Sequence, residues 1–248
     1  MKKIYLIFIF AILLIPSYSV KADIEDDMLI QVSQSEKYYK TITNNNTLYG
    51  LQNNSSSNTY TIEISKEEYD NANVSNNLKS VTIETTYKKL VSTIYQNGSK
   101  YRYKAELTWK NFPSTRSYDI MAIGFYPSVT KNTGPYFSLY FCKTDGNCYT
   151  TTSFYPQTFS AGAGASFKLP TGSLTELVAT LYFDVVKTNN VTVTGQIAAA
   201  DYSHATNTVT ANQSKNYTVG AGGINLGSSI ANKYDAISAA TATWEGTW

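Results

Sequence analysis

Hydrophobic and polar side chains alternate most clearly at residues 101–110. The odd-numbered positions are aromatic or apolar, and the even-numbered ones are charged or carry a hydroxyl. A period of two is typical of a β-strand that buries one face and exposes the other to water. We therefore predict a half-buried strand in this part of the chain.

The dipeptide Asn97-Gly98 comes shortly before that strand. Its tolerance of positive φ favours a two-residue hairpin turn. If these two residues form the turn, Gln96 pairs with Ser99, and Lys89 then lies opposite Glu106 on the solvent face. The segment before the turn therefore becomes the first strand of a predicted hairpin.

Residues 119–126 carry apolar side chains on both faces. This pattern predicts a central strand that is covered on both sides, and so a second layer of structure. Residues 177–185 and 191–197 also alternate, whereas the apolar spacing at 230–237 suits a short helix. Many short strands separated by turn signals predict an all-β fold, an antiparallel β-sandwich with hairpins. Further short strands are expected at 206–211 and 216–219.

The two cysteines, Cys142 and Cys148, stand at the inner ends of two strand-like runs, 136–142 and 148–154. The loop between them contains Asp145-Gly146, which predicts a hairpin. In an oxidising compartment we expect the cysteines to form a disulfide at its tip. A structural zinc site would need four ligands and accompanying histidines, and a redox site would need C-x-x-C spacing.

Residues 1–22 have the three parts of a secretory signal peptide: Lys2 and Lys3, an apolar run at 4–15, and small residues that predict cleavage after Ala22. The apolar run is shorter than the roughly 20 residues of a transmembrane helix. Cleavage would remove three of the 20 basic residues and none of the 18 acidic ones, so the net charge would change from +2 to −1. A secreted chain so close to neutrality is a poor candidate for binding nucleic acid or anionic lipid through charge.

Residues 23–79 contain few aliphatic residues and two tracts rich in Asn and Ser. We expect a loosely ordered N-terminal extension here, because such tracts bury too little apolar area to offset their chain entropy. Within the extension, Ser65 and Glu68 have capping-box spacing, which predicts one short helix near 66–72. The β-sandwich domain is then expected over 80–248.

Few residues carry recognisable chemistry. His204, the one histidine of the sequence, lies in a polar segment that we expect to be a solvated turn. The sequence contains no H-E-x-x-H, phosphate-loop or EF-hand motif. Glu106, Asp119 and Asp184 are candidate acids for a hydrolase, but nothing in the sequence brings two of them to the separation that glycoside hydrolysis requires. We assign no catalytic residue, cofactor or metal ligand from the sequence.

Residues 109–119 read W-K-N-F-P-S-T-R-S-Y-D. This segment resembles a group of uncharacterised secreted β-rich proteins of low-GC Gram-positive bacteria, which share a W-K-x-[MFI]-P-x-x-R-S-Y-D-like core after a strand hairpin. The resemblance implies an exported protein and carries no assigned activity. Within the core, Arg116 and Asp119 form a candidate structural pair that would fix the turn between them. The resemblance extends over residues 60–127 and includes the segments 63–72 and 101–103.

The 21 tyrosines of the sequence offer flat, amphipathic surfaces suited to stacking on sugars or to protein contacts. With Trp109, Trp244 and Trp248 as candidate contact residues, they favour a secreted, non-catalytic binding or surface-interaction protein, whose ligand is a cell-envelope glycan or a protein. The alternative is a membrane-acting, pore-forming toxin whose inserting hairpin is 191–219, with a loop at 201–204. A second alternative, an extracellular hydrolase, would need a cleft lined by acids.

Overall fold

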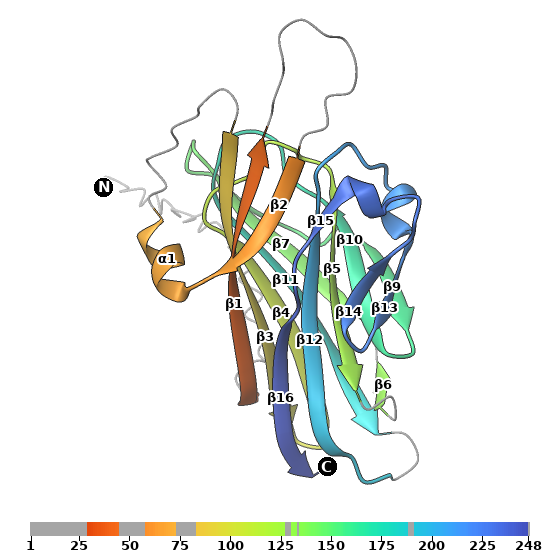
Figure 1. The fold of residues 1–248 in the computed structure, drawn as a ribbon. Helices are drawn as coiled ribbons and strands as arrows, with labels where there is room; N and C mark the ends of the chain where they lie inside the picture. Colours follow the sequence, from red (N-terminus) through yellow and green to blue (C-terminus); the bar gives the residue numbers. More distant parts are fainter. Residues whose placement is uncertain are drawn as a thin grey trace, which may run out of the picture.

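The protein is a sandwich of two antiparallel β-sheets, with a small hairpin lying on the outside of the second sheet (Figure 1). The all-β, antiparallel fold predicted from the sequence is therefore confirmed. Among the described residues, no helix is long and apolar enough to cross a membrane. The computed structural model describes residues 29–44, 58–72, 83–126, 130–132, 134–187 and 191–247.

The first sheet has eight strands in the order β2-β1-β3-β4-β11-β7-β8, and β6 pairs with β11 beside this path. Every pairing in it is antiparallel. Its strands are β1 (Ile30–Asn44), β2 (Asn58–Ile64), β3 (Ile83–Asn97), β4 (Lys100–Trp109), β6 (Thr130–Asn132), β7 (Tyr136–Lys143), β8 (Cys148–Thr151) and β11 (Leu174–Lys187).

The second sheet has the order β15-β12-β5-β10-β9, and β16 pairs with β12. A separate hairpin of β13 and β14 forms the third layer. The strands are β5 (Tyr118–Tyr126), β9 (Tyr155–Phe159), β10 (Gly162–Lys168), β12 (Thr194–Ala205), β13 (Tyr217–Gly220), β14 (Gly223–Leu226), β15 (Tyr234–Ala236) and β16 (Ala240–Thr247).

The main core lies between the inner faces of the two sheets and contains most of the large buried side chains. The alternation predicted for 101–110 is seen in β4, where the inward row is buried and the even-numbered side chains from Lys104 on are more exposed. The hydroxyl of Ser92 on β3 donates to the carbonyl of Ala198 on β12 at 2.8 Å, a polar tie between the sheets. The inward row of β4 is Tyr101, Tyr103, Ala105, Leu107 and Trp109.

Strand β5 is buried on both faces, as its sequence predicted. Met121 faces the main core, while Ile120 belongs to a second core under the β13–β14 hairpin. Gly124 allows the β13–β14 hairpin to pack closely on the sheet, because a Cβ at this position would come 2.0 Å from the carbonyl oxygen of Gly220. The second layer predicted over residues 119–126 is thus present on both sides.

The predicted β3–β4 hairpin exists, but its predicted register is wrong. Asn97 pairs with Lys100, so the two loop residues are Gly98 and Ser99. The left-handed φ of +57° falls on Gly98, the first loop position, where a glycine meets no steric penalty. The pairing is displaced by two residues, and Glu106 lies opposite Val91 instead of Lys89. Because the displacement is even, each side chain stays on its predicted face.

Part of the expected N-terminal extension belongs to the first sheet. Strand β1 pairs along its length with β3, and β2 pairs with β1, so the expectation of loose order is wrong for both strands. The sheet satisfies their backbone groups and buries the ring of Tyr39, while most polar side chains of β1 remain at least partly exposed. Residues 23–28, 45–57 and 73–79 of the expected extension lie outside the described residues, as does the signal peptide.

A short helix, α1 (Lys66–Asn71), follows β2 where the capping-box pattern predicted it. The backbone N–H of Glu68 donates to the hydroxyl of Ser65 at 3.0 Å. Tyr69 packs its ring against Tyr38 of β1, with 5.0 Å between ring centroids. This contact holds the helix against the first sheet.

Two expectations for the C-terminal third are wrong. The helix expected at 230–237 is a single 3₁₀ turn, Ala231–Lys233, followed by β15, because Tyr234 pairs with Ala205 and continues the second sheet. The stretch 191–219, which the alternative pore-forming function takes as an inserting hairpin, contains strand β12, and β12 pairs with β5, β15 and β16. Residues 201–204 are buried within that strand and do not form a loop.

Candidate functional site

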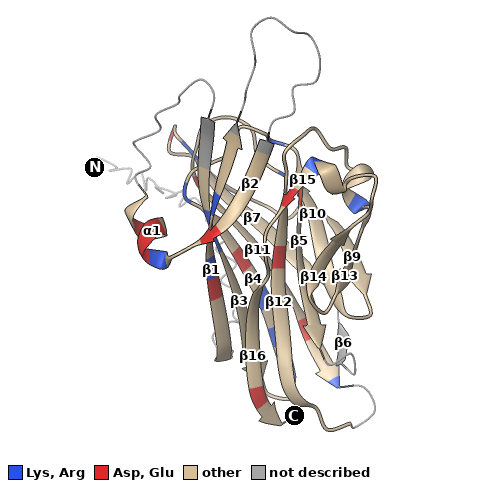
Figure 2. Ribbon diagram, viewed as in Figure 1, with Lys and Arg blue, Asp and Glu red and all other residues tan. Residues whose placement is uncertain are grey.

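A group of ionisable side chains is buried between the two sheets. Its cation is Lys88 on β3, whose side chain is 0% exposed. Even-numbered positions of β3 face the second sheet, as the burial of Leu90 and Ile94 shows, and Lys88 shares that face. We did not predict this lysine as a site residue, although its two-residue spacing from Leu90 is the sequence signal for it. Figure 2 marks the positions of the basic and acidic residues along the ribbon, most of which is tan.

The Lys88 ammonium group is enclosed by polar and aromatic neighbours. Its Nζ donates to the Thr41 hydroxyl at 3.0 Å and lies 3.5 Å from Oδ2 of Asp235. The ring centroids of Trp109 and Tyr202 are 5.0 and 5.6 Å from Nζ. Burial lowers the pKa of Lys88, and the nearby carboxylates oppose this effect only in part.

Asp235 reaches the same pocket from β15 in the second sheet. Its Oδ2 accepts hydrogen bonds from the hydroxyls of Thr41 and Thr61, and its backbone pairs with that of His204. The threonines come from β1 and β2 of the first sheet, so four strands, β1, β2, β3 and β15, meet at this carboxyl group. Lys88 and Asp235 therefore form a contact that crosses from one sheet to the other.

Asp119 on β5 forms a second buried carboxylate site. The backbone N–H of Ala205 donates to Oδ1 at 2.9 Å, and Nδ1 of His204 lies 3.1 Å from both oxygens. The Tyr202 hydroxyl donates to Oδ2. Burial and the adjacent Asp119 carboxylate raise the pKa of Tyr202 well above its ordinary value, so this phenol stays protonated as a donor. The charge of Asp119 also acts on Lys88.

Two expectations about these residues need correction. His204 was expected in a solvated turn, but it is buried in β12, because Asp119 and the ring of Trp109 enclose it. Asp119 was expected to pair with Arg116; among the described contacts its partners come from β12, and the Arg116 guanidinium lies over the ring of Phe112, 5.7 Å from its centroid. Sequence reasoning missed these contacts, since they join residues far apart in the chain.

Of the candidate contact tryptophans, the two within the described residues do not form an exposed surface. Trp109 is 3% exposed and belongs to the main core. Trp244 is half-buried and packs on Tyr101, with 5.0 Å between ring centroids. Trp248 lies outside the described residues.

The three candidate acids lie in two separate places. Glu106 and Asp184 are on the outward face of the first sheet, next to Lys104 and Arg102 respectively. Asp119 is in the second sheet and is wholly buried. Among the described residues no group of histidine, cysteine and acidic side chains is arranged to hold a metal ion.

Asp201 is a third buried carboxyl group, on the outer side of β12. The backbone N–H groups of Tyr202 and Ile224 donate to its two oxygens, each at 2.7 Å. The contact with Ile224 ties β14 to the second sheet. Burial raises the pKa of Asp201 to about 6, although the two N–H donors lower it in part.

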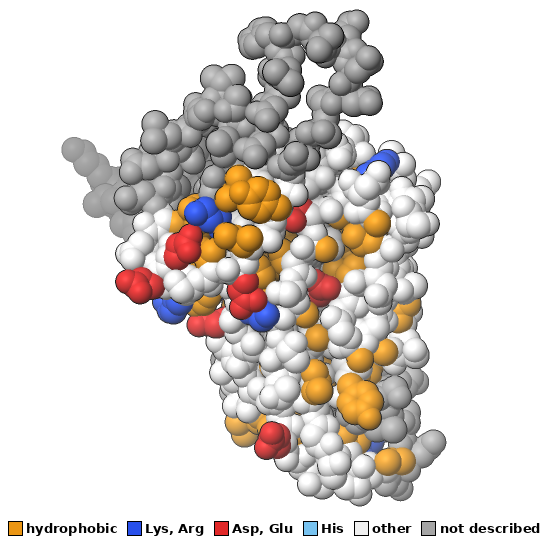
Figure 3. Space-filling model, in the orientation of Figure 1, with side chains coloured by type: hydrophobic (Ala, Val, Ile, Leu, Met, Phe, Trp, Pro, Cys, Tyr) orange, Lys and Arg blue, Asp and Glu red, His pale blue; other side chains and the backbone are white. Residues whose placement is uncertain are grey.

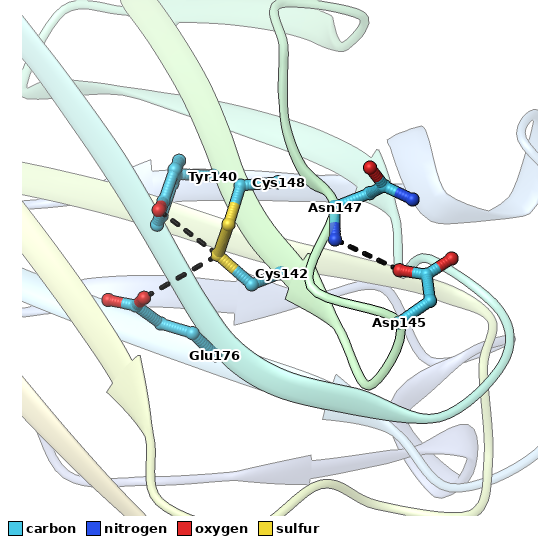
Figure 4. The surroundings of a disulfide bond; sticks show 6 residues. All are labelled: Tyr140, Cys142, Asp145, Asn147, Cys148 and Glu176. Atoms are coloured by element: carbon cyan, nitrogen blue, oxygen red, sulfur yellow. Dashed lines mark hydrogen bonds between the residues drawn. A yellow bond between two sulfur atoms is a disulfide. The ribbon is translucent and has the colours of Figure 1, made fainter.

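The disulfide predicted between Cys142 and Cys148 is present, and it closes the β7–β8 hairpin (Figure 4). The hydroxyl of Tyr140 lies 3.0 Å from Sγ of Cys142, and since a disulfide has no S–H, the tyrosine is the donor. Glu176 of β11 lies 3.7 Å from the same sulfur. In the loop, the N–H of Asn147 donates to the carboxylate of Asp145, which lowers the pKa of Asp145.

Tyr149 directly follows the disulfide on β8, the last strand of its sheet. Its side chain is 44% exposed. The ring stacks on Phe141 with 5.3 Å between centroids and 25° between planes, and Nζ of Lys143 lies 5.1 Å from its centroid. We call Phe141, Lys143 and Tyr149 the Tyr149 platform. Other tyrosines and aliphatic residues are exposed elsewhere, including Tyr60 and Ile62 on β2, where hydrophobic side chains gather beside α1 (Figure 3).

The sequence matches no family model and no curated protein. Among solved structures, one titled "BspA_C_WT" is 9% identical over 86% of this chain and 85% of its own length, with a TM-score of 0.36. The full-length major pilin SpaD from Corynebacterium diphtheriae is 8% identical over 68% of this chain and 55% of its own, with a TM-score of 0.29. At these values the likeness says nothing about function.

Proposed function

We propose that the protein is a secreted, non-catalytic binding protein that recognises a glycan of the cell envelope through the Tyr149 platform. The observation that carries this proposal is an exposed tyrosine ring held in place by stacking on a disulfide-closed hairpin. Export rests on the signal-peptide pattern of residues 1–22, and N-terminal sequencing of the exported protein is expected to begin at Asp23.

The Tyr149 platform suits sugar recognition for two physical reasons. A tyrosine ring offers a flat apolar face for the C–H groups of a sugar, and its order in the free protein reduces the entropy cost of binding. Charged groups lie at the same hairpin: Lys143 beside the ring, and Asp145 in the loop. Such groups can hydrogen-bond the hydroxyls of a sugar that lies on the ring.

Binding without catalysis is favoured by the placement of the acids. A glycosidase of the usual kind needs two carboxyl groups about 5 to 10 Å apart and open to substrate. Asp119 is buried and held by hydrogen bonds, and Glu106 and Asp184 lie on the opposite, outward side of the first sheet. The exposed aromatic ring is the better candidate for ligand contact.

Binding of the mature chain, residues 23–248, to a glycan array and to isolated cell-wall material tests the proposal. Tyr149→Ala is expected to weaken binding about 2- to 12-fold, because aromatic pairs contribute about 0.5 to 1.5 kcal/mol. Tyr149→Phe keeps the ring and is expected to retain most of the affinity. Tyr155→Ala removes a comparably exposed tyrosine from β9 and serves as the matched control.

The proposal fails if neither the array nor the cell-wall material retains the wild-type protein. It also fails if Tyr155→Ala lowers binding while Tyr149→Ala does not, because the ligand would then contact a different face. Loss of binding in both variants to the same extent would point to general destabilisation, which thermal unfolding of the two variants would detect.

A further inference from the structure

The amine of Lys88 and the carboxyl of Asp235 meet in the interior, with Nζ 3.5 Å from Oδ2. We propose that these two side chains are joined by an intramolecular amide bond, which links β3 of the first sheet covalently to β15 of the second. The proposal concerns side chains between the sheets and is independent of glycan binding at the Tyr149 platform.

The surroundings favour reaction of the amine. The rings of Trp109 and Tyr202 lie 5.0 and 5.6 Å from Nζ and Lys88 is fully buried, so water has little access to the amine. Burial lowers the pKa of Lys88, which favours the neutral amine, the nucleophilic form. The fold also holds the amine of Lys88 close to the carboxyl group of Asp235, which raises the effective concentration of the two reacting groups.

The two carboxyl groups near Lys88 differ in how they are held. Asp119 receives hydrogen bonds from Ala205 and Tyr202 and contacts His204, which keeps its carboxylate within its own set of partners. Oδ2 of Asp235 points at the amine, and the threonine hydroxyls of β1 and β2 fix it there. Asp235 is therefore the carboxyl group that reacts, and Asp119 stays with its own hydrogen-bond partners.

The reaction is a condensation that needs no oxidant or other co-reactant. A proton of the Lys88 ammonium group passes to the Asp235 carboxylate, the freed amine Nζ attacks Cγ of Asp235, and a C–N bond forms. One carboxyl oxygen leaves as water, taking one hydrogen from the amine and one from the carboxyl group. The product is a neutral secondary amide. Condensation removes two charges from an environment in which an ion pair is costly to maintain.

Intact-mass spectrometry of the purified protein under denaturing conditions tests the proposal. The wild-type mass is expected to lie about 18 Da below the sequence mass, in addition to the about 2 Da lost in the disulfide. A protease digest is expected to contain one branched peptide in which the segment carrying Lys88 is joined to the segment carrying Asp235. Fragmentation of that peptide identifies the linked residues directly.

Lys88→Met and Asp235→Ala are expected to abolish the loss of about 18 Da, since each removes one reacting group. Lys89→Met, one residue away on the outward face, is the matched control and is expected to retain it. The mass is read on denatured chains, so a variant that folds poorly still gives a result, and the wild-type branched peptide is independent of any variant.

Three results would overturn the proposal. The first is a wild-type mass that differs from the sequence only by the disulfide. The second is a loss of about 18 Da that persists in Lys88→Met, which would place the dehydration elsewhere in the chain. The third is a branched peptide that joins Lys88 to Asp119 in place of Asp235.

Discussion

The buried carboxyl group of Asp201 makes a quantitative prediction about pH and stability. Its pKa is raised to about 6 from an ordinary value of 3.8. Between these two values the folded protein holds a proton that the unfolded chain has lost, so the free energy of unfolding falls as the pH rises. The stabilisation that the protonated Asp201 carboxyl group contributes is fully present below pH 3.8, and it is lost as the pH rises above the folded-state pKa of about 6.

The size of the effect follows from the same two values. One pKa unit corresponds to about 1.36 kcal/mol, which makes the whole effect about 3 kcal/mol and the part between pH 4 and pH 7 about 2 kcal/mol. Asp201→Asn removes this titration. The variant also loses one acceptor for the N–H groups of Tyr202 and Ile224, so its absolute stability will differ. The informative quantity is therefore the difference in free energy of unfolding between the wild type and Asp201→Asn, followed as a function of pH.

Urea unfolding of both proteins at pH 4, 5, 6 and 7 measures that difference. The wild type is expected to lose about 2 kcal/mol relative to Asp201→Asn between the extremes of this series. Asp145→Asn serves as the control, because hydrogen bonding lowers the pKa of exposed Asp145 and gives a change of opposite sign. A wild-type-minus-Asp201→Asn difference that stays constant across the series would refute the reasoning.

Three further predictions concern packing and cross-links. Replacing Cys142 and Cys148 together by serine opens a ring with a sequence separation of 6 and is expected to cost about 2 kcal/mol, or about 4 to 8 °C in Tm by calorimetry; an unchanged Tm would contradict it. Gly124→Ala is expected to cost about 1 to 3 kcal/mol in urea unfolding, because its Cβ would meet the β13–β14 hairpin, whereas Gly222→Ala meets nothing within 4 Å and is expected to be neutral. Ser92→Ala removes the hydrogen bond between the sheets and is expected to cost about 1 kcal/mol in the same assay; a stabilised variant would show that the tie is unfavourable.

The sequence predicted those elements whose patterns are local. The alternation at 101–110 and the apolar run at 119–126 identified β4 and β5, because each buries its faces in the expected way. The disulfide and α1 followed from short-range spacing. Strand β1 was missed because its composition is polar, and its order comes from pairing with β3 and β2, which a local window does not include.

The candidate sites also differ in how far local sequence patterns could predict them. The disulfide hairpin could be located from the spacing of its cysteines, although the stacking of Tyr149 on Phe141 could not. The Lys88 pocket was missed entirely, since Asp235 is brought to it by β15, a three-residue strand with no distinctive pattern. Its one sequence signal is a lysine in an inward row of β3. Contacts between residues so far apart become visible only when the topology is known.

The strand order of the first sheet also limits when this protein can fold. Strand β4 pairs with β3 on one side and with β11 on the other, and β11 begins at Leu174. Until that part of the chain has been made, β4 lacks its second hydrogen-bonded partner. Pairings between distant segments form slowly because chain closure comes before any stabilising contact. The first sheet can therefore be completed only after β11 has been made, and until then the β4 edge of the preceding strands remains open.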